Sequence, residues 1–101
     1  MTFERIMGIY VSNNEDYQRY REAMVPILKS FGGAFGYDFN VSEVLLSKTT
    51  DKINRVFTIE FPSKDSMDEF FSNPDYLVVK NKYFNRSVTS ATVISLHEKH
   101  S

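Results

Sequence analysis

The stretch that decides the fold runs from Arg55 to Tyr76 and reads RVFTIEFPSKDSMDEFFSNPDY. Large apolar side chains occupy every second position from Phe57 to Phe61, which is the pattern of a β-strand with one buried face. Pro62 ends this strand, and Ser63 stands where a helix N-cap is needed. The stretch therefore predicts a strand, a capped turn and an amphipathic helix.

A similar unit comes earlier in the chain, at Glu4–Phe31, and reads ERIMGIYVSNNEDYQRYREAMVPILKSF. Its strand is expected at Arg5–Val11, with Asn13 or Asn14 as the N-cap of the following helix. Gly32 and Gly33 are expected to end that helix, because glycine adopts the left-handed cap conformation without a Cβ penalty. The chain thus contains two strand-helix units.

Two further strands complete the pattern. The second strand begins at Ala34, with Phe35, Tyr37, Phe39 and Val41 expected on one face. The apolar run Val44–Leu46 breaks this alternation and predicts a bulge or a switch of environment, and the polar Thr49–Asn54 predicts a hairpin turn. Asn73 and Pro74 open a second short helical piece, the last strand is expected at Ser90–Leu96, and the tail from His97 is expected to fray.

The resulting order is strand, helix, strand, strand, helix, strand. This order predicts an α+β fold, the ferredoxin-like βαββαβ sandwich, in which helices cover one face of a four-stranded antiparallel sheet. Residues 1–101 are expected to form a single domain. The other face of the sheet would carry Ile6, Gly8, Tyr10 and Val56, which is too apolar for water, so we expect two copies to pair as a homodimer.

Composition excludes several classes of function. The formal net charge is -1 and the charged residues are scattered singly, so the chain lacks the basic surface that nucleic acid or an anionic membrane requires. The chain has no Cys and its N-terminus is neither a signal peptide nor a membrane span, which favours a cytoplasmic protein. The two histidines, His97 and His100, have no companions at metal-ligand spacing, so we expect neither a metal nor a cofactor.

Three short motifs resemble the bacterial family described as domain of unknown function 1330. They are the Gly32 and Gly33 pair before the second strand, the E-F-P-S junction at residues 60–63, and the S-x-P-x-Y break at residues 72–76. The resemblance covers nearly the whole chain and implies the dimeric α+β barrel, a fold shared with small monooxygenases, decarboxylases and stress-response proteins. It implies no catalytic residue, because the activity of the family is not established.

The chain departs from this family at two positions. Relatives often have Arg directly after the glycine pair, where this chain has Ala34, and Arg where this chain has Tyr83. If those arginines bind an anion in relatives, this protein has lost that ligand or has replaced the charge with Lys82 or Arg86.

Five residues are candidates for a ligand site. Glu60 lies within an apolar strand, so it is either solvated at the barrel mouth or desolvated and able to act as a general acid or base. Tyr10 and Tyr37 either offer hydroxyls to a ligand or simply pack in their strands. Tyr83 and Arg86 are expected in a loop before the last strand, where they shape a pocket or lie on the surface.

Other polar residues are expected to have structural roles. Tyr17 and Tyr20 fall on the buried stripe of the first helix and are predicted core residues, and Asp38 is expected to be solvated. If Glu60 is buried, we expect it within hydrogen-bond reach of a Tyr, Lys or Arg, with Tyr10 or Arg86 as the favoured partners, because an unpaired buried carboxylate is costly.

Three functions remain open at this point. The first is a homodimer that binds a small, mostly apolar molecule inside the barrel. The second is a cofactor-free enzyme of the monooxygenase or isomerase type, with Glu60 and a tyrosine as proton-transfer groups. The third is a purely structural dimer with a filled interior, and the fold alone does not decide between them.

Overall fold

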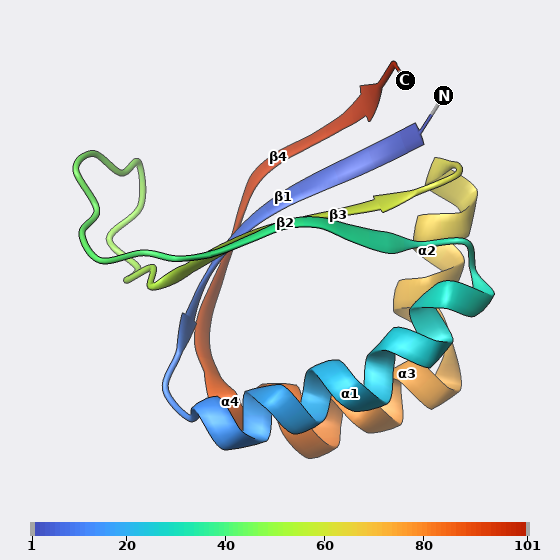
Figure 1. Cartoon of the computed structure of the whole chain (residues 1–101), viewed down its shortest axis with the longest axis horizontal. Coiled ribbons are helices and arrows are strands. Elements are labelled where there is room, and N and C mark those ends of the chain that lie inside the picture. The colour runs from blue at the N-terminus through green and yellow to red at the C-terminus, as the bar shows by residue number, and fades with distance from the viewer. Residues whose placement is uncertain (1, 101) are drawn as a thin grey trace.

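The computed structural model describes residues 2–100. Its four strands form one antiparallel sheet in the order β2-β3-β1-β4, with all helices on one face (Figure 1). This arrangement confirms the predicted α+β fold and the predicted order of strands and helices. The elements are β1 (Thr2–Val11), α1 (Asn14–Ser30), β2 (Ala34–Asn40), β3 (Arg55–Phe61), α2 (Lys64–Ser72), α3 (Pro74–Val79), a π-helical turn η1 (Lys80–Phe84), α4 (Asn85–Ser87) and β4 (Val88–Lys99).

The helices begin at side-chain caps that the sequence predicts. The Asn13 side chain accepts a hydrogen bond from the backbone N–H of Asp16 at 3.0 Å, which settles the choice between Asn13 and Asn14. Ser63 caps α2 and Asn73 caps α3 in the same way, at 3.1 and 3.0 Å. Each cap satisfies one of the backbone N–H groups that a helix leaves without a partner.

The exit from α1 uses its two glycines for different reasons. Gly32 adopts the left-handed conformation, with φ of 74°. Gly33 does not, but a Cβ atom there would overlap Leu28 and lie 2.9 Å from the Phe61 ring. Close approach of backbone to core, rather than backbone conformation, therefore requires glycine at position 33, which corrects the sequence-based reason.

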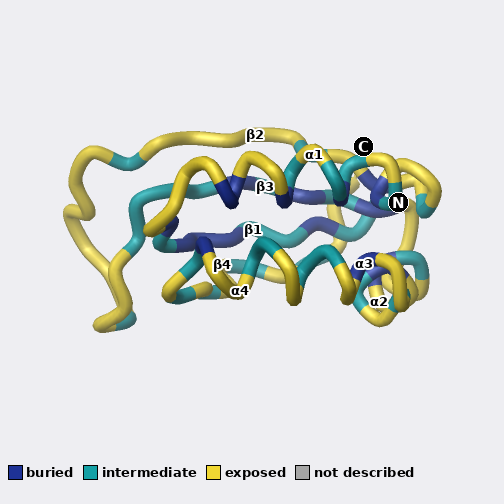
Figure 2. Tube along the Cα trace, turned by 90° about the horizontal axis from the view of Figure 1, so that it is seen from below, coloured by how far each residue is buried: buried dark blue, intermediate teal, exposed yellow. Residues whose placement is uncertain are grey.

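The core lies between the sheet and the helices. Its central side chains come from β1, α1, β3 and α2, and Figure 2 shows burial concentrated along β1 and β3, the two central strands. Edge strands β2 and β4 are largely exposed. The most deeply buried large side chains are Ile9, Tyr17, Met24, Leu28, Phe61, Met67 and Phe70.

The face assignment predicted for β2 is wrong beyond Phe35. The register between β2 and β3 shifts between Phe35 and Asp38, so that Phe35 packs against the core while Phe39 turns to the open face of the sheet. Such a shift marks an extra residue in one strand, and an extra residue exchanges the two faces. Tyr37 and Phe39 stack on each other with ring centroids 5.8 Å apart and are 63% and 56% exposed.

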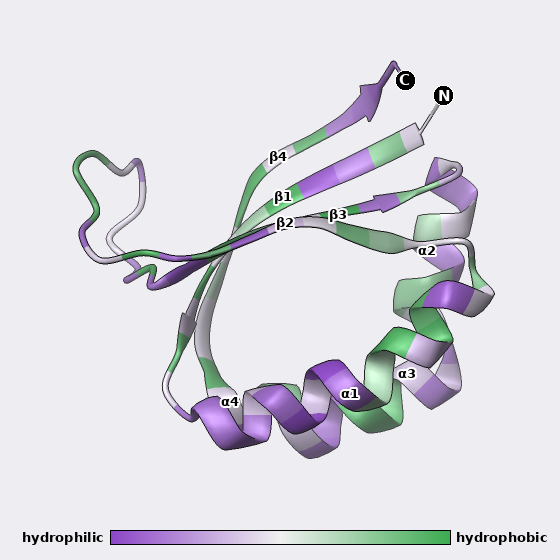
Figure 3. Cartoon of the chain, in the orientation of Figure 1, coloured by the Kyte–Doolittle hydropathy of each residue, from purple (hydrophilic) through white to green (hydrophobic). Residues whose placement is uncertain are grey.

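The segment between β2 and β3 is a long loop, not a bulged strand followed by a short turn. β2 ends at Asn40, and Leu45 and Leu46 are 88% and 92% exposed in the loop (Figure 3). Asn54 fastens the base of the loop, since its side chain accepts from the backbone N–H of Val11 at 2.8 Å and donates to the Val11 carbonyl at 2.9 Å.

The C-terminal third also departs from expectation in two places. Tyr83 and Arg86 lie in helical turns η1 and α4, not in a loop. β4 extends to Lys99, so His97 is part of a paired strand and not of a frayed tail. Among residues 2–100 no helix is long and apolar enough to cross a membrane.

Candidate functional site

A cavity of about 170 Å³ lies between the sheet and the helices of the single chain. Its wall is mostly aromatic and aliphatic, with contributions from strands β1 to β4 and from α1, α2, α3 and η1. No Asp or Glu is among the lining residues. These residues are Arg5, Met7, Ile9, Tyr17, Tyr20, Met24, Phe35, Phe57, Ile59, Phe71, Tyr76, Lys80, Phe84 and Ala91.

Two tyrosines of different helices meet at this cavity. The hydroxyl oxygens of Tyr20 on α1 and Tyr76 on α3 are 2.8 Å apart, and both residues are buried. Burial raises the pKa of both hydroxyls, so both remain protonated at neutral pH. The site therefore offers phenolic O–H groups and not a phenolate base.

Arg5 and Lys80 bring positive charge to the same cavity. The Arg5 guanidinium lies over the Phe71 ring, with its central carbon 4.3 Å from the ring centroid. Burial lowers the pKa of Arg5 from its ordinary value, yet an arginine remains charged at neutral pH.

The π-helical turn η1 shapes one side of the cavity. It carries Lys80 and Phe84 to the lining, and the Phe84 ring lies 5.0 Å from that of Tyr20. Single π-turns inside helices are frequent at functional sites because the inserted residue redirects side chains.

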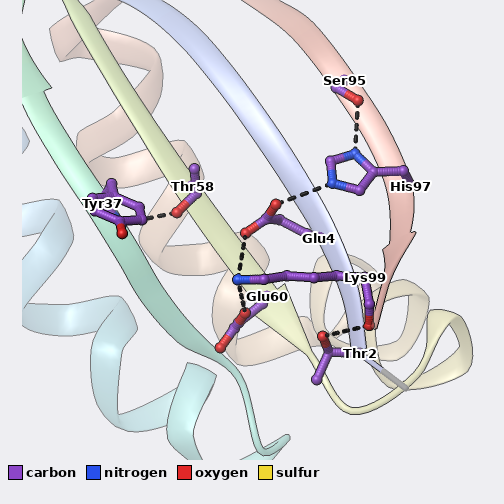
Figure 4. A network of polar contacts seen from close by, with 8 residues as sticks. All are labelled: Thr2, Glu4, Tyr37, Thr58, Glu60, Ser95, His97 and Lys99. Atoms are coloured by element: carbon purple, nitrogen blue, oxygen red, sulfur yellow. Dashed lines mark hydrogen bonds and ion pairs between the residues drawn. The ribbon is translucent and has the colours of Figure 1, made fainter. Parts of the chain in front are cut away.

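The open face of the sheet holds a different group of polar residues, shown in Figure 4. Glu4 of β1 contacts His97 of β4 at 3.0 Å, and Lys99 of β4 is 3.5 Å from both Glu4 and Glu60. The negative charge of Glu4, followed by that of Glu60, raises the pKa of Lys99. Ser95 completes the network through a 2.7 Å contact with the other ring nitrogen of His97.

Beside this network the open face is apolar. The long loop and the neighbouring strands form a groove of about 790 Å³, lined mainly by aliphatic side chains. Gly8 lies under this layer, since a Cβ at that position would come within 2.8 Å of Ile53 and 3.2 Å of Ile94. The groove residues are Val41, Val44, Leu45, Leu46, Ser47, Lys48, Thr49, Ile53, Val56, Thr92, Val93 and Ile94.

The five candidates from the sequence are dispersed and do not line the sheet–helix cavity. Glu60 belongs to the open face, is only partly buried and contacts a lysine, Lys99, which is a partner of the expected kind; the favoured partners Tyr10 and Arg86 were the wrong choice. Tyr10 pairs with Ser90 near the other end of β1, and Arg86 on α4 is 3.7 Å from Asp16. Tyr37 is exposed on β2, and Tyr83 packs at the edge of the core.

The residue that the sequence reading missed is Arg5. By strict alternation Arg5 shares the face of Met7, Ile9 and Val11, which the pattern already predicts to be buried. A charged residue on a buried stripe was the available signal. Tyr17 and Tyr20 are core residues as predicted, but they also line the cavity.

The expectation that Asp38 is solvated also needs correction, because its carboxylate is paired with two arginines. Arg55 donates two hydrogen bonds to its carboxylate, at 2.9 and 2.7 Å, and Arg21 of α1 lies 3.2 Å away. The Arg55 hydrogen bonds are the main cause that lowers the pKa of Asp38. In residues 2–100 no group of three or more His, Cys, Asp or Glu is placed to hold a metal ion.

Solved structures show that this chain has a common fold. A protein of unknown function from Rhodopseudomonas palustris is similar with a TM-score of 0.79 and 16% identity, over 99% of this chain and 83% of that one. A dabb family protein with a ferredoxin-like fold from Mesorhizobium loti has a TM-score of 0.67 and 12% identity, over 99% and 98% of the two chains. These likenesses confirm the predicted ferredoxin-like fold.

A third neighbour adds information on assembly. It is a dimeric protein of unknown function with a ferredoxin-like fold from Bacteroides fragilis, with a TM-score of 0.65 and 13% identity, over 97% of this chain and 96% of that one. No curated protein matches the sequence. The model of the domain of unknown function 1330 matches residues 5–96, so the chain belongs to this family.

Proposed function

We propose that the protein is a cytoplasmic homodimer in which each chain binds a small, mostly apolar molecule in the cavity between its sheet and its helices. The cavity itself is the observation that carries this proposal. Its volume of about 170 Å³ is slightly larger than the ~150 Å³ cavity that suffices for a benzene molecule. A ring-sized compound is therefore the expected ligand.

The cavity is surrounded by side chains that favour such a ligand. Native interiors are close-packed, so an opening of this size among large rings is unusual. The ring of Phe57 and the side chains of Met24 and Ile59 supply apolar contacts, while the Tyr20 and Tyr76 hydroxyls supply polar ones. A few polar groups on an apolar wall are typical of small-molecule sites.

The open face of the sheet supports the dimer. An exposed apolar patch on this scale usually marks an interface, and obligate dimers bury ~2,000 Å² or more in total. The charged residues beside the groove already contact each other within one chain, so a second copy can cover them without facing a charged group that lacks a partner. The neighbour described as dimeric adds support from the same fold.

The enzyme alternative has less support. Glu60 lies on the open face, so it is not positioned to exchange a proton with a ligand held on the helix side of the sheet. The cavity tyrosines have raised pKa values, which makes them hydrogen-bond donors and not bases.

The test uses toluene as the probe and amide chemical shifts as the readout. We expect saturable shifts around the cavity in the wild-type protein, and their loss in Ala91→Phe, which places a ring on the exposed edge strand at the cavity wall. Thr89→Phe is the matched control, because position 89 is exposed on the same strand and does not line the cavity. Absence of saturable shifts with toluene and also with single-ring compounds that carry a polar group, or equal toluene binding by Ala91→Phe and the wild type, would overturn the binding proposal.

A further inference from the structure

Arg5 differs from every other arginine that the structure describes. Each of the others has a carboxylate partner: Arg19 and Arg86 contact Asp16, and Arg21 and Arg55 contact Asp38. Within residues 2–100 no Asp or Glu lies within ion-pair distance of Arg5, and its Nε is buried without a hydrogen-bond partner.

This lack of a partner is energetically costly. A buried donor without an acceptor costs ~1–3 kcal/mol, and more when the group is charged. The contact between the guanidinium and the Phe71 ring compensates only in part, because cation–π contacts contribute ~0.5–2 kcal/mol and no hydrogen bond. A ligand that carries a hydrogen-bond acceptor would therefore satisfy the unpaired donor of Arg5.

The tyrosine pair next to Arg5 has spare donor capacity of its own. Two hydroxyls carry two protons, but only one proton lies between the Tyr20 and Tyr76 oxygens. No other acceptor for either hydroxyl occurs among the described residues. Arg5 and Tyr76 line the same cavity; burial raises the pKa of the Tyr76 hydroxyl, whereas the Tyr20 hydrogen bond and then the positive charge of Arg5 lower it.

The cavity thus presents donors and positive charge without a carboxylate in its lining; the negative charge of Asp68 on α2 acts on Arg5 from beyond ion-pair distance and is itself paired with Lys64. Arg5 and Lys80 line it, and no carboxylate does. A neutral hydrocarbon would leave the Arg5 donors unpaired, and a dianion would lose much hydration among the apolar side chains. A ligand with a single carboxylate on an apolar body would pair with Arg5 and would lose less hydration than a dianion.

We propose that the ligand is a ring-sized monocarboxylate, with its carboxylate on Arg5 and the tyrosine pair and its apolar body against Met24, Phe57 and Ile59. This inference rests on the proposed function and specifies the chemical class of its ligand. Arg5 is the residue that determines specificity, because guanidinium and carboxylate pair in a bidentate, charge-assisted geometry.

The test compares two probes of nearly the same shape, benzoate and benzamide, by isothermal titration calorimetry at neutral pH. We expect the wild-type protein to prefer benzoate by at least about tenfold, as befits a charge-assisted hydrogen bond. Arg5→Gln should abolish the preference while still binding benzamide, and Arg5→Lys should restore part of it. Arg19→Gln removes the same charge from an exposed position and should leave the preference unchanged.

The outcomes separate the two proposals. Binding of benzamide as tightly as benzoate by the wild type, or an undiminished preference in Arg5→Gln, overturns the carboxylate inference but leaves the cavity as a binding site. Binding of neither benzoate, benzamide nor toluene overturns both proposals. If Arg5→Gln does not fold, the wild-type preference and the chemical shifts of the Tyr20 and Tyr76 rings on addition of benzoate still decide the question.

Discussion

The two faces of the sheet differ in whether their charged side chains have partners of opposite charge. On the open face Glu4, Glu60, His97 and Lys99 form a network in which each charged group has a partner. On the helix face the partly buried Arg5 lies over the Phe71 ring, its Nε has no hydrogen-bond partner, and no carboxylate among residues 2–100 is within ion-pair distance. A face on which each charged group already has a partner is suited to a second copy of the same chain, whereas an unpaired charge beside a cavity is suited to a ligand that brings the opposite charge.

The largest effect should come from placing a charge in the apolar groove of the open face, and it should be seen in dimer association. We expect Leu46→Asp to dissociate the dimer, because it places a carboxylate at an exposed apolar position of the groove. Interface side chains of this kind contribute ~2 kcal/mol or more, which corresponds to at least about a thirtyfold weaker dimer. Sedimentation velocity over a range of micromolar concentrations measures the change.

The control for this experiment lies on the other side of the molecule. Val78 on α3 is 65% exposed, so Val78→Asp adds the same charge outside the groove and should leave association unchanged. A stable wild-type monomer at these concentrations would contradict the assignment of the open face as the dimer interface.

The second-largest effect is on the free energy of unfolding and tests how closely α1 packs on the helix face of the sheet. We expect Gly33→Val to lower the free energy of unfolding by ~1–3 kcal/mol, because the new side chain meets Leu28 and Phe61, each 1% exposed and unable to move aside. Gly36→Ala should cost less, since Gly36 is exposed on the edge strand β2 and its closest neighbour is the hydroxyl of one side chain, Thr58 of β3. Equal urea midpoints for the two variants would show that the contact at position 33 is looser than described.

Much of the fold follows from local sequence signals, and the errors have physical causes. The caps at Asn13, Ser63 and Asn73 were predictable because each depends on a side chain only three residues from its partner. Which β2 side chains face the core was not predictable, because the register shift after Phe35 depends on pairing with β3. Strict alternation has no means of detecting an extra residue in one strand.

The site was harder to predict than the fold for a similar reason. Tyr20 and Tyr76 are 56 positions apart in sequence and meet only because α1 and α3 pack on the same face of the sheet. Glu60 stood out in the sequence as a charge within an apolar strand, but the residue that neutralises it, Lys99, comes from a segment expected to fray. Arg5 was detectable from its place on the buried stripe of β1.

The smallest expected effect is the loss of stability when a carboxylate that pairs with arginines on the helix side is removed. It tests the contrast between these paired arginines and Arg5. Asp38, opposite Phe57 on the helix side of β2, is the carboxylate partner of both Arg55 and Arg21, whereas Arg5 has no carboxylate within ion-pair distance among residues 2–100. We expect Asp38→Asn to cost about 1 kcal/mol or less at pH 7, because the carboxylate is partly exposed and its ion pairs are screened by solvent.

The pH dependence of that cost gives the decisive measurement. The Arg55 hydrogen bonds lower the pKa of Asp38 in the folded state below its unfolded value of ~3.9, so the folded state favours the ionised carboxylate. The stabilisation is therefore present in full above that unfolded value and is lost as the pH falls through the folded pKa. Urea unfolding at pH 7, 5 and 3 should show a constant gap between wild type and Asp38→Asn at the two higher values and a smaller gap at pH 3. Glu43→Gln, in the exposed loop, should show no such trend, and a gap that widens as the pH falls would contradict the pairing of Asp38 with Arg55.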